Sequence, residues 1–154
     1  MADEVRELLE ADGYSVANVD ALADGPGFRK IRRALGEGPG FRKVRRELGV
    51  TAFGVNAIEL PPGFETGRHF HDEQEELYFV HRGRIRIRLN DETEHVLGPG
   101  GLARVDASTV RQIKNVGDEP AVYLIAGGQD GYVGRDGRLP EGETSRFGPA
   151  GQPG

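Results

Sequence analysis

Hydrophobic and polar positions change their spacing near residue 51, and this change divides the chain into two parts. Before that point, apolar residues recur as Phe28, Ile31 and Leu35, a spacing typical of an amphipathic helix. From Thr51 onward, short apolar runs of strand length alternate with turn clusters such as PPG, GPGG and NVGDEP. Closely spaced short strands are typical of a β-sandwich or β-barrel. We therefore expect an all-β domain over residues 51–127.

Two apolar runs differ in how their side chains should be covered. The run RIRIRL (84–89) alternates strictly, so its isoleucines and leucine should face the core and its arginines the solvent. In the run ELYFVH (76–81), Leu77 and Phe79 fall on one face, whereas Tyr78 and Val80 fall on the other. A strand that is apolar on both faces is covered on both. We expect the N-terminal segment or a second subunit to supply that cover, which predicts a homodimer.

Residues 1–50 are predicted to form a helical, basic segment with a duplicated 13-residue repeat (25–37 and 38–50). The sequence GPGFRKIRRALG recurs as GPGFRKVRRELG, with ten of twelve positions identical. Each copy predicts a two-turn helix that begins after Gly-Pro-Gly and ends at a glycine. Residues 25–50 hold eight Lys/Arg and two Glu, a local charge of +6. This suggests either a nucleic-acid-binding arm or a solvated face opposite a short apolar stripe, and we favour the solvated face.

Composition narrows the range of functions. The 154 residues suffice for one domain, and a net charge of -5 gives no general reason to expect a nucleic-acid partner. The lack of cysteine excludes disulfides, iron-sulfur clusters and thiolate zinc sites. No signal-peptide pattern and no membrane-length apolar run occurs, so we expect a cytoplasmic protein with no membrane partner. Residues 128–154 form a Gly/Pro-rich extension whose end we expect to be disordered.

A cluster of candidate metal ligands precedes and enters the run ELYFVH. His69 and His71 are two residues apart, so both imidazoles should point from one face of an extended strand into the barrel. Glu76 follows after an acidic turn. Together the three residues match the facial arrangement of two histidines and one carboxylate that binds a metal ion. The same pattern also fits a polar-lined pocket without metal.

With these residues the sequence resembles the cupin superfamily, specifically a small single-domain member. The first motif of that superfamily contains a glycine, a His-x-His pair, a glutamate and a second glycine, and each position is filled, by Gly63, His69, His71, Glu76 and Gly83. The second motif is degenerate. Its ends match Gly100 and Asn115, but Asp106, Ser108 and Arg111 replace its proline, its glycine and its metal-binding histidine.

The resemblance implies a double-stranded β-helix, or jelly-roll, barrel with a small-molecule pocket. It also implies a possible divalent metal, which would be iron, manganese, zinc or nickel. Cupins include isomerases, epimerases and dioxygenases as well as proteins that only bind ligands, so whether this chain is an enzyme stays open.

Arg111 separates two hypotheses. By strand parity it enters the same cavity as His69, His71 and Glu76, yet a guanidinium has no lone pair to offer a cation. In the first hypothesis these three residues hold a metal, Arg111 anchors a small anionic substrate, and Tyr78 is a proton donor for an isomerase, epimerase or dioxygenase. In the second, Arg111 pairs with Glu76, and a metal-free, non-catalytic barrel binds or senses a small polar ligand.

Overall fold

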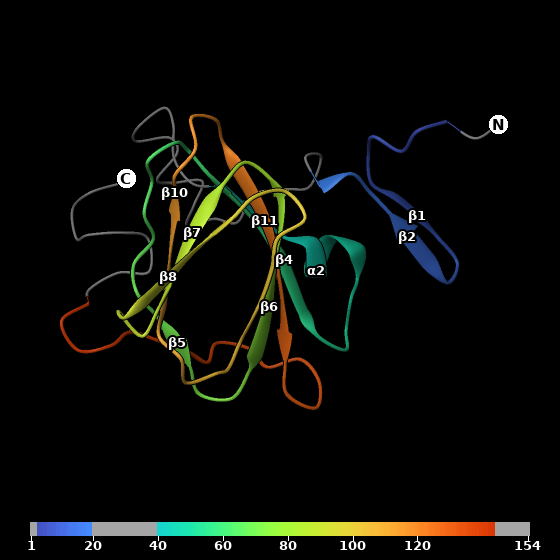
Figure 1. Ribbon diagram of the computed structural model, residues 1–154. Helices are drawn as coiled ribbons and strands as arrows, with labels where there is room; N and C mark the ends of the chain where they lie inside the picture. The colour runs from blue at the N-terminus through green and yellow to red at the C-terminus, as the bar shows by residue number, and fades with distance from the viewer. Residues whose placement is uncertain (1–2, 20–39, 144–154) are drawn as a thin grey trace.

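A computed structural model of the chain describes residues 3–19 and 40–143 and consists of a β-barrel with a β-hairpin beside it (Figure 1). One wall of the barrel is a five-stranded sheet with the order β3 (Gly40–Arg42), β4 (Gly54–Leu60), β11 (Ala121–Gly128), β6 (Glu75–Arg82) and β9 (Leu102–Val105). The facing wall is a three-stranded sheet with the order β10 (Arg111–Asn115), β7 (Ile85–Leu89) and β8 (Thr93–Leu97). Two smaller sheets pair β12 (Gly137–Arg138) with β5 (Phe70–His71) and β1 (Leu9–Ala11) with β2 (Tyr14–Val16).

Every strand pair in these sheets is antiparallel. The segment between β4 and β6 follows the edge of β10 through two isolated bridges, Glu65 with Lys114 and His69 with Arg111. The predicted all-β class is therefore confirmed.

The barrel interior holds the main hydrophobic core. As the alternation of RIRIRL predicted, Ile85 and Ile87 on β7 are buried, whereas Arg84 is exposed and Arg86 and Arg88 are partly exposed. Phe64, in the segment after β4, and side chains of the other strands complete the core. The strand residues are Ile58, Leu60, Tyr78, Val80, Val105, Ile113, Ala121 and Tyr123.

The second copy of the repeat does not form the predicted two-turn helix. Instead β3 pairs with the edge of β4, and the Arg42 guanidinium lies 3.0 Å from the Glu59 carboxylate. Only residues 44–48 are helical, as α2 (Val44–Leu48), which ends at Gly49 in the left-handed conformation. Pairing with β4 therefore overrides the helical spacing in the first half of the copy. The first copy (25–37) lies outside the described residues.

A second, smaller apolar cluster lies on the outer face of the five-stranded sheet. Val44 of α2 packs there against Val55 and Ala57 of β4. Within the described residues, the N-terminal segment thus covers β4 and leaves Leu77 and Phe79 of β6 exposed. No helix in the described part of the chain is long and apolar enough to cross a membrane.

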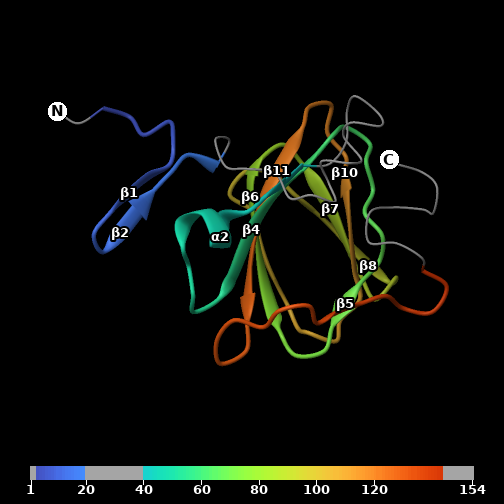
Figure 2. The same ribbon diagram turned by 180° about the vertical axis from the view of Figure 1, so that it is seen from behind.

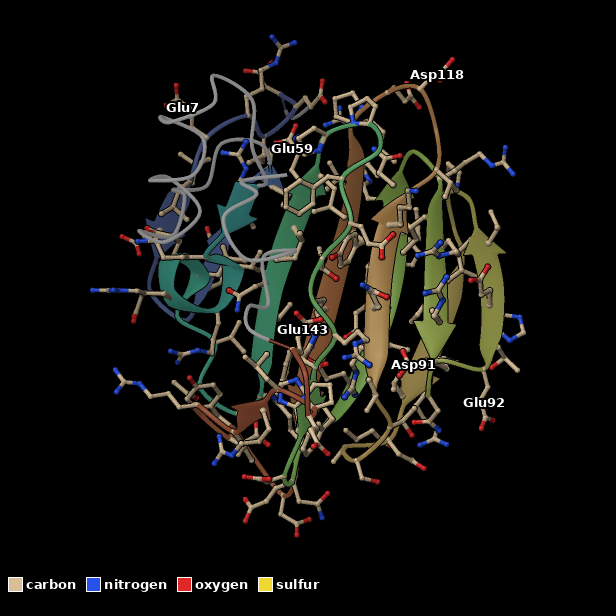
Figure 3. The ribbon with its side chains drawn as sticks, turned by 90° about the vertical axis from the view of Figure 1, so that its left-hand side faces the viewer. Glu7, Glu59, Asp91, Glu92, Asp118 and Glu143 are labelled. Carbon is tan, nitrogen blue, oxygen red and sulfur yellow. The ribbon has the colours of Figure 1, made fainter. Side chains whose placement is uncertain are left out.

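The chain after β11 runs across one end of the barrel, at the bottom of Figures 1 and 2. There β12 pairs with β5. The Arg68 guanidinium then joins this segment to the barrel, because it lies 2.9 Å from the Asp91 carboxylate and 3.5 Å from that of Glu143. Figure 3 shows both acidic residues. The expected disorder at the end of the extension concerns residues 144–154, which lie outside the described part.

Gly83, in the turn between β6 and β7, should be intolerant of a side chain. Its φ is +80°, and an added Cβ would lie 2.7 Å from the Ala121 Cα. We expect Gly83→Ala to lower the free energy of unfolding by about 2–4 kcal/mol, because backbone strain adds to a clash with main chain. Gly63→Ala is the matched control, with a φ of +77° and open space around the Cβ position. It should cost only about 1 kcal/mol in urea denaturation, and equal losses for both variants would contradict the clash.

Candidate functional site

His69 and His71 reach the barrel interior because the backbone around them is extended and tied to β10. The His69 N–H donates to the Arg111 carbonyl (3.0 Å), and the Arg111 N–H donates back to the His69 carbonyl (2.8 Å). Both imidazoles are buried, with ring centroids 5.3 Å apart and planes at 82°. The predicted convergence of the two rings is therefore present.

Glu76 enters the same cavity from β6, and three polar side chains approach its carboxylate oxygen Oε1. The Tyr78 hydroxyl donates to Oε1 at 2.8 Å. The His71 Nε2 lies 3.1 Å from this oxygen, and the Arg111 Nη2 lies 3.6 Å from it. Burial by itself raises the pKa of Glu76, but the hydrogen bond and charge of His71 and the charge of Arg111 outweigh it, so this pKa is lowered. Glu76 is therefore a buried, ionised carboxylate.

Arg111 is completely buried, and β10 directs it into the cavity as strand parity predicted. Its Nη1 and Nη2 donate to the carbonyls of Ala107 (3.1 Å) and Asp106 (3.0 Å), which fixes the plane of the guanidinium. The buried Nε has no hydrogen-bond partner among the residues of the described ranges. Arg111 therefore balances the charge of Glu76 and still has a donor to offer.

Tyr78 is held on Glu76. Burial and the nearby charge of Glu76 raise the pKa of the Tyr78 hydroxyl well above its usual value of 10. The hydroxyl therefore keeps its proton at neutral pH and directs it at the carboxylate. This geometry suits a group that orients Glu76, and the predicted role of Tyr78 as a proton donor stays a prediction.

Asp136, which precedes β12, completes the site, and sequence analysis did not identify it. Its Oδ1 lies 2.8 Å from the His71 Nδ1, and its Oδ2 accepts the backbone N–H groups of Glu73 and Gln74. Burial opposes ionisation of Asp136, but these hydrogen bonds outweigh it and lower its pKa. The only signal in the sequence is its place in the turn-rich run GYVGRDG (131–137).

Asp136 also determines which nitrogen of His71 faces the cavity. A carboxylate beside Nδ1 favours a proton on that atom, and Nε2 is the nitrogen that faces the cavity and Glu76. The Gln74 amide lies 2.9 Å from the same Nδ1. Its oxygen, rather than its nitrogen, must then face the ring, an exchange that leaves the shape of the amide unchanged.

The buried cluster of His69, His71 and Glu76 is compatible with a divalent metal. One ligand atom from each residue lies within 4.8 Å of the others. Two atoms that each lie about 2.1 Å from one ion are separated by at most about 4.2 Å. Small side-chain shifts would therefore bring the three ligand atoms to bonding distance of a single ion. The hydrogen bond from His71 to Asp136 is the outer contact that a ligating histidine usually makes.

Gly127 of β11 permits the close approach of the neighbouring strand behind Glu76. A Cβ there would lie 2.8 Å from the Glu75 carbonyl oxygen and 3.2 Å from the Glu76 Cγ. The absence of a side chain at this position therefore lets β6 place Glu76 where it meets both His71 and Arg111.

Comparison with known proteins agrees with this architecture. Residues 56–127 match the family model described as Cupin domain. One similar solved structure is that of a sugar phosphate isomerase from Silicibacter pomeroyi, described as a cupin superfamily protein. Its sequence is 27% identical, its TM-score is 0.60, and the match covers 86% of this chain and 93% of that one. No curated protein matches the sequence.

Two other solved structures share the fold at lower identity. A putative sugar phosphate isomerase from Acidithiobacillus ferrooxidans is 24% identical with a TM-score of 0.52, and the match covers 58% of each chain. A variant of the oxalate decarboxylase of Bacillus subtilis is 22% identical with a TM-score of 0.57, and the match covers 68% of this chain. The chain spans 58% of the first of these two proteins and 29% of the second, less than two thirds of either.

We expect Asp136→Ala to lower the free energy of unfolding by about 2–4 kcal/mol, because three polar groups lose a charged acceptor. Amide hydrogen exchange at Glu73 and Gln74 should become faster. Asp118→Ala is the control, because Asp118 is exposed on a loop at the opposite end of the barrel (Figure 3). This control should change stability by less than about 0.5 kcal/mol. Unchanged exchange at both amides in Asp136→Ala would contradict the prediction.

Proposed function

Since the chain belongs to the cupin superfamily through residues 56–127, we propose that its barrel is a metal-dependent active site for a small anionic substrate. The observation that carries the proposal is the buried cluster of His69, His71 and Glu76 with the guanidinium of Arg111 beside it. The cluster offers a cation three ligands, and the arginine offers an anion a fixed donor.

His69, His71 and Glu76 would hold the metal, and the chemistry of these ligands fits iron, manganese, zinc or nickel. When bound, the ion would act as a Lewis acid on an oxygen of the substrate. Asp136 holds Nδ1 of His71, so that Nε2 would present its lone pair to a bound ion, and Tyr78 keeps one oxygen of Glu76 fixed. The carbonyls of Asp106 and Ala107 hold the guanidinium in one plane.

Charge favours an anionic substrate only when the metal is present. Glu76 and Asp136 contribute two negative charges and Arg111 one positive charge, so with neutral histidines the site carries -1. A divalent ion changes this sum to +1. In a buried site of low effective dielectric, that difference in sign decides whether an anion is attracted. The proposal therefore requires anion binding to depend on metal.

The substrate class that fits best is a small phosphorylated sugar, and the reaction class is isomerisation. The relative from Silicibacter pomeroyi, which is described as a sugar phosphate isomerase, matches nearly the whole of both chains. A phosphate or carboxylate would also be the natural partner of an arginine whose guanidinium plane is already fixed. Epimerisation and oxidation by dioxygen remain within the same proposal, since they need the same ligands and the same anchor.

The alternative is a metal-free barrel that binds or senses a small polar ligand. One observation favours it: the Glu76 Oε1 lies within 3.6 Å of Arg111 and 3.1 Å of His71, so the carboxylate already has cationic and polar neighbours. In this reading both nitrogens of His71 donate to carboxylates and Arg111 neutralises Glu76. The pocket would then select a ligand by hydrogen bonding alone.

Metal content separates the two functions. Protein purified without a tag or a chelating column should contain close to one iron, manganese, zinc or nickel ion per chain. His69→Ala should weaken metal binding by more than about 100-fold, because even the outer partners of a ligand contribute about 10- to 100-fold. Elemental analysis measures the metal content, and a titration with the metal ion measures the affinity. His95→Ala, which removes an exposed histidine on β8, is the matched control and should change neither. Metal-free protein that stays so after incubation with divalent ions would favour the binding function.

Substitution of Arg111 tests the anion anchor. In metal-loaded protein, Arg111→Gln should weaken the binding of inorganic phosphate by about 100-fold, the effect of losing a charge-assisted hydrogen bond. Metal affinity should hold or rise, because a positive charge near the ion is removed. Isothermal titration calorimetry measures both affinities. Arg111→His distinguishes the alternative, because tighter metal binding with ligand binding retained would show that the arginine had stood in for a metal.

A further inference from the structure

The side chains of the candidate site are almost completely shut off from solvent. The exposed fractions of the three candidate ligands and their arginine neighbour are 7% for His69, 3% for His71, 6% for Glu76 and 0% for Arg111. These fractions leave no opening through which a solute as large as a sugar phosphate could pass. An ion or small molecule from solvent can therefore reach the site only if part of the protein moves.

That movement has to occur at one end of the barrel. Deeper in the barrel, the strands that carry Glu76 and Arg111 continue into the hydrophobic core, where Tyr78 and Ile113 are buried. In the other direction lies the barrel end with β5, and the chain after β11 crosses this end (Figures 1 and 2). A route from solvent to the site therefore passes the crossing segment.

Residues 134–143, which we call the strap, are held less firmly than the other backbone at this end. The strap contains β12, a strand of two residues, whose sheet partner in the described ranges is β5 alone. The turn before β10 is held more firmly, because its Asp106 and Ala107 carbonyls accept the Arg111 guanidinium. The Ala107 carbonyl also accepts the His71 N–H at 2.8 Å. The strap is therefore the segment that detaches most easily.

The strap begins at a hinge. Just before it, the Tyr132 ring is anchored on α2, with the Arg45 guanidinium carbon 4.0 Å from the ring centroid. Gly134 has no side chain, and Arg135 adopts the left-handed conformation, with a φ of +57°. A non-glycine residue in this conformation is strained, and strained residues are concentrated at segments that switch. The anchored tyrosine and the two residues after it thus separate a fixed part of the chain from a movable one.

One buried residue holds the strap closed. The Asp136 carboxylate is buried against the His71 ring, with its Oδ1 2.8 Å from Nδ1. Three backbone N–H groups of the turn 72–74 also donate to Asp136, one to its carbonyl and two to its Oδ2. Detachment of the strap breaks all four contacts at once and also releases this turn.

The other charged contacts of the strap are open to water. Arg138 and Asp72, 2.7 Å apart, are both about half exposed. Near the end of the strap, the Glu143 carboxylate accepts the Arg68 N–H at 3.0 Å, and the arginine side chain is partly exposed. Solvent-exposed ion pairs contribute little to stability, because water replaces them readily. Asp136 therefore makes the largest contribution to the closed position.

We propose that the strap is a gate over the candidate site, held closed by the contact of Asp136 with His71. With the strap detached, the site is open to solvent at this end of the barrel. With the strap in place, Asp136 fixes His71 with Nε2 facing the cavity. A cation bound at Nε2 would therefore favour the closed gate, and a closed gate would favour the cation to the same extent. Only this coupling rests on the proposed function, because opening itself needs neither metal nor substrate.

Amide hydrogen exchange tests whether the strap opens. The N–H groups of Asp72, Glu73 and Gln74 all donate to Asp136, so detachment exposes them together. After correction for intrinsic rates, they should exchange alike and at least about 100-fold faster than the amides of His69 and Arg111, which bond each other in the barrel wall. Equal protection of all five amides would mean that the strap opens only when the barrel unfolds, which would overturn the proposal.

An engineered disulfide can lock the strap. Phe70 of β5 and Arg138 of β12 are directly opposite each other. Such Cα atoms lie about 4.5–5.5 Å apart, a separation that a disulfide spans. The double variant Phe70→Cys with Arg138→Cys has no other thiol, because the chain lacks cysteine. Phe70 alternates with His69 and His71, so the disulfide lies on the face of the strand away from the site.

Modification of histidine by diethyl pyrocarbonate measures access to the site. His69 and His71 should react at least about 100-fold more slowly in the oxidised lock than in the same variant reduced. The exposed His81 and His95 are internal controls and should react equally fast in both forms. Equal rates at His69 and His71 in the two forms would overturn the gate.

A second disulfide provides the matched control for the lock. Arg88 of β7 and Gln112 of β10 are also directly opposite each other, in the barrel wall away from the strap. Oxidation of Arg88→Cys with Gln112→Cys should leave the reactivity of His69 unchanged. A comparable slowing by this disulfide would mean that general stiffening of the barrel, rather than the strap, limits access, and would contradict the proposal.

Substitution of Asp136 should have the opposite effect to the lock. Asp136→Ala should speed the modification of His69 by about tenfold or more, because the strap loses its charged acceptor. Arg138→Ala removes only an exposed ion pair and should speed it by less than about fivefold. His69 is the better reporter here, because Asp136 contacts the His71 ring itself. A larger effect of Arg138→Ala than of Asp136→Ala would contradict the role of Asp136.

The gate and the proposed function can fail separately, because exchange and modification need no metal. If the lock protects both histidines but the protein binds no divalent ion, the metal site is refuted and the gate stands. If Co²⁺ enters the oxidised and the reduced lock at equal rates, the gate is refuted and the metal site stands.

Discussion

The buried negative charge of Glu76 is the constraint around which the interior of this barrel is organised. An ionised carboxylate removed from water costs several kcal/mol unless polar groups replace its hydration. Tyr78, His71 and Arg111 all approach the same oxygen of Glu76. Two of these neighbours then need partners of their own. The guanidinium finds the carbonyls of the turn before β10, and the imidazole finds Asp136.

This series of contacts links the centre of the barrel to a segment that follows the last strand of its five-stranded wall. Asp136 lies beyond residues 56–127, which match the cupin family model. It nevertheless contacts His71 directly and caps the turn that precedes β6. The segment that follows β11 is therefore part of the site, and the Arg68 contacts with Asp91 and Glu143 attach it to the barrel wall.

Strand parity explains why much of the site was predictable from sequence. Once the domain is known to be β, alternation decides which side chains face the cavity, so His69, His71, Glu76 and Arg111 could be placed together. Asp136 could not be placed in this way. It lies in a turn-rich segment without periodic spacing, and its partner is 65 residues away, so only tertiary structure brings the two together.

The repeat failed as a helix predictor for a related reason. Its apolar spacing is helical along the chain, but the open edge of β4 offers backbone hydrogen bonds that a short, solvated helix cannot match. Likewise, the doubly apolar pattern of β6 correctly indicates two apolar faces but says nothing about what covers the outer one. Local spacing reports which side chains prefer burial, whereas the partner surface is a property of the whole fold.

The duplication has a consequence for the edge of the barrel wall at β4. The second copy supplies the strand, the ion pair to Glu59 and the apolar side chains that contact β4. The first copy has the same residues at the backbone-pairing and ion-pairing positions, with isoleucine in place of Val44. Loss of one 13-residue unit would thus leave a sequence that can form the same strand and the same ion pair beside β4. The edge strand of the barrel is in this sense encoded twice.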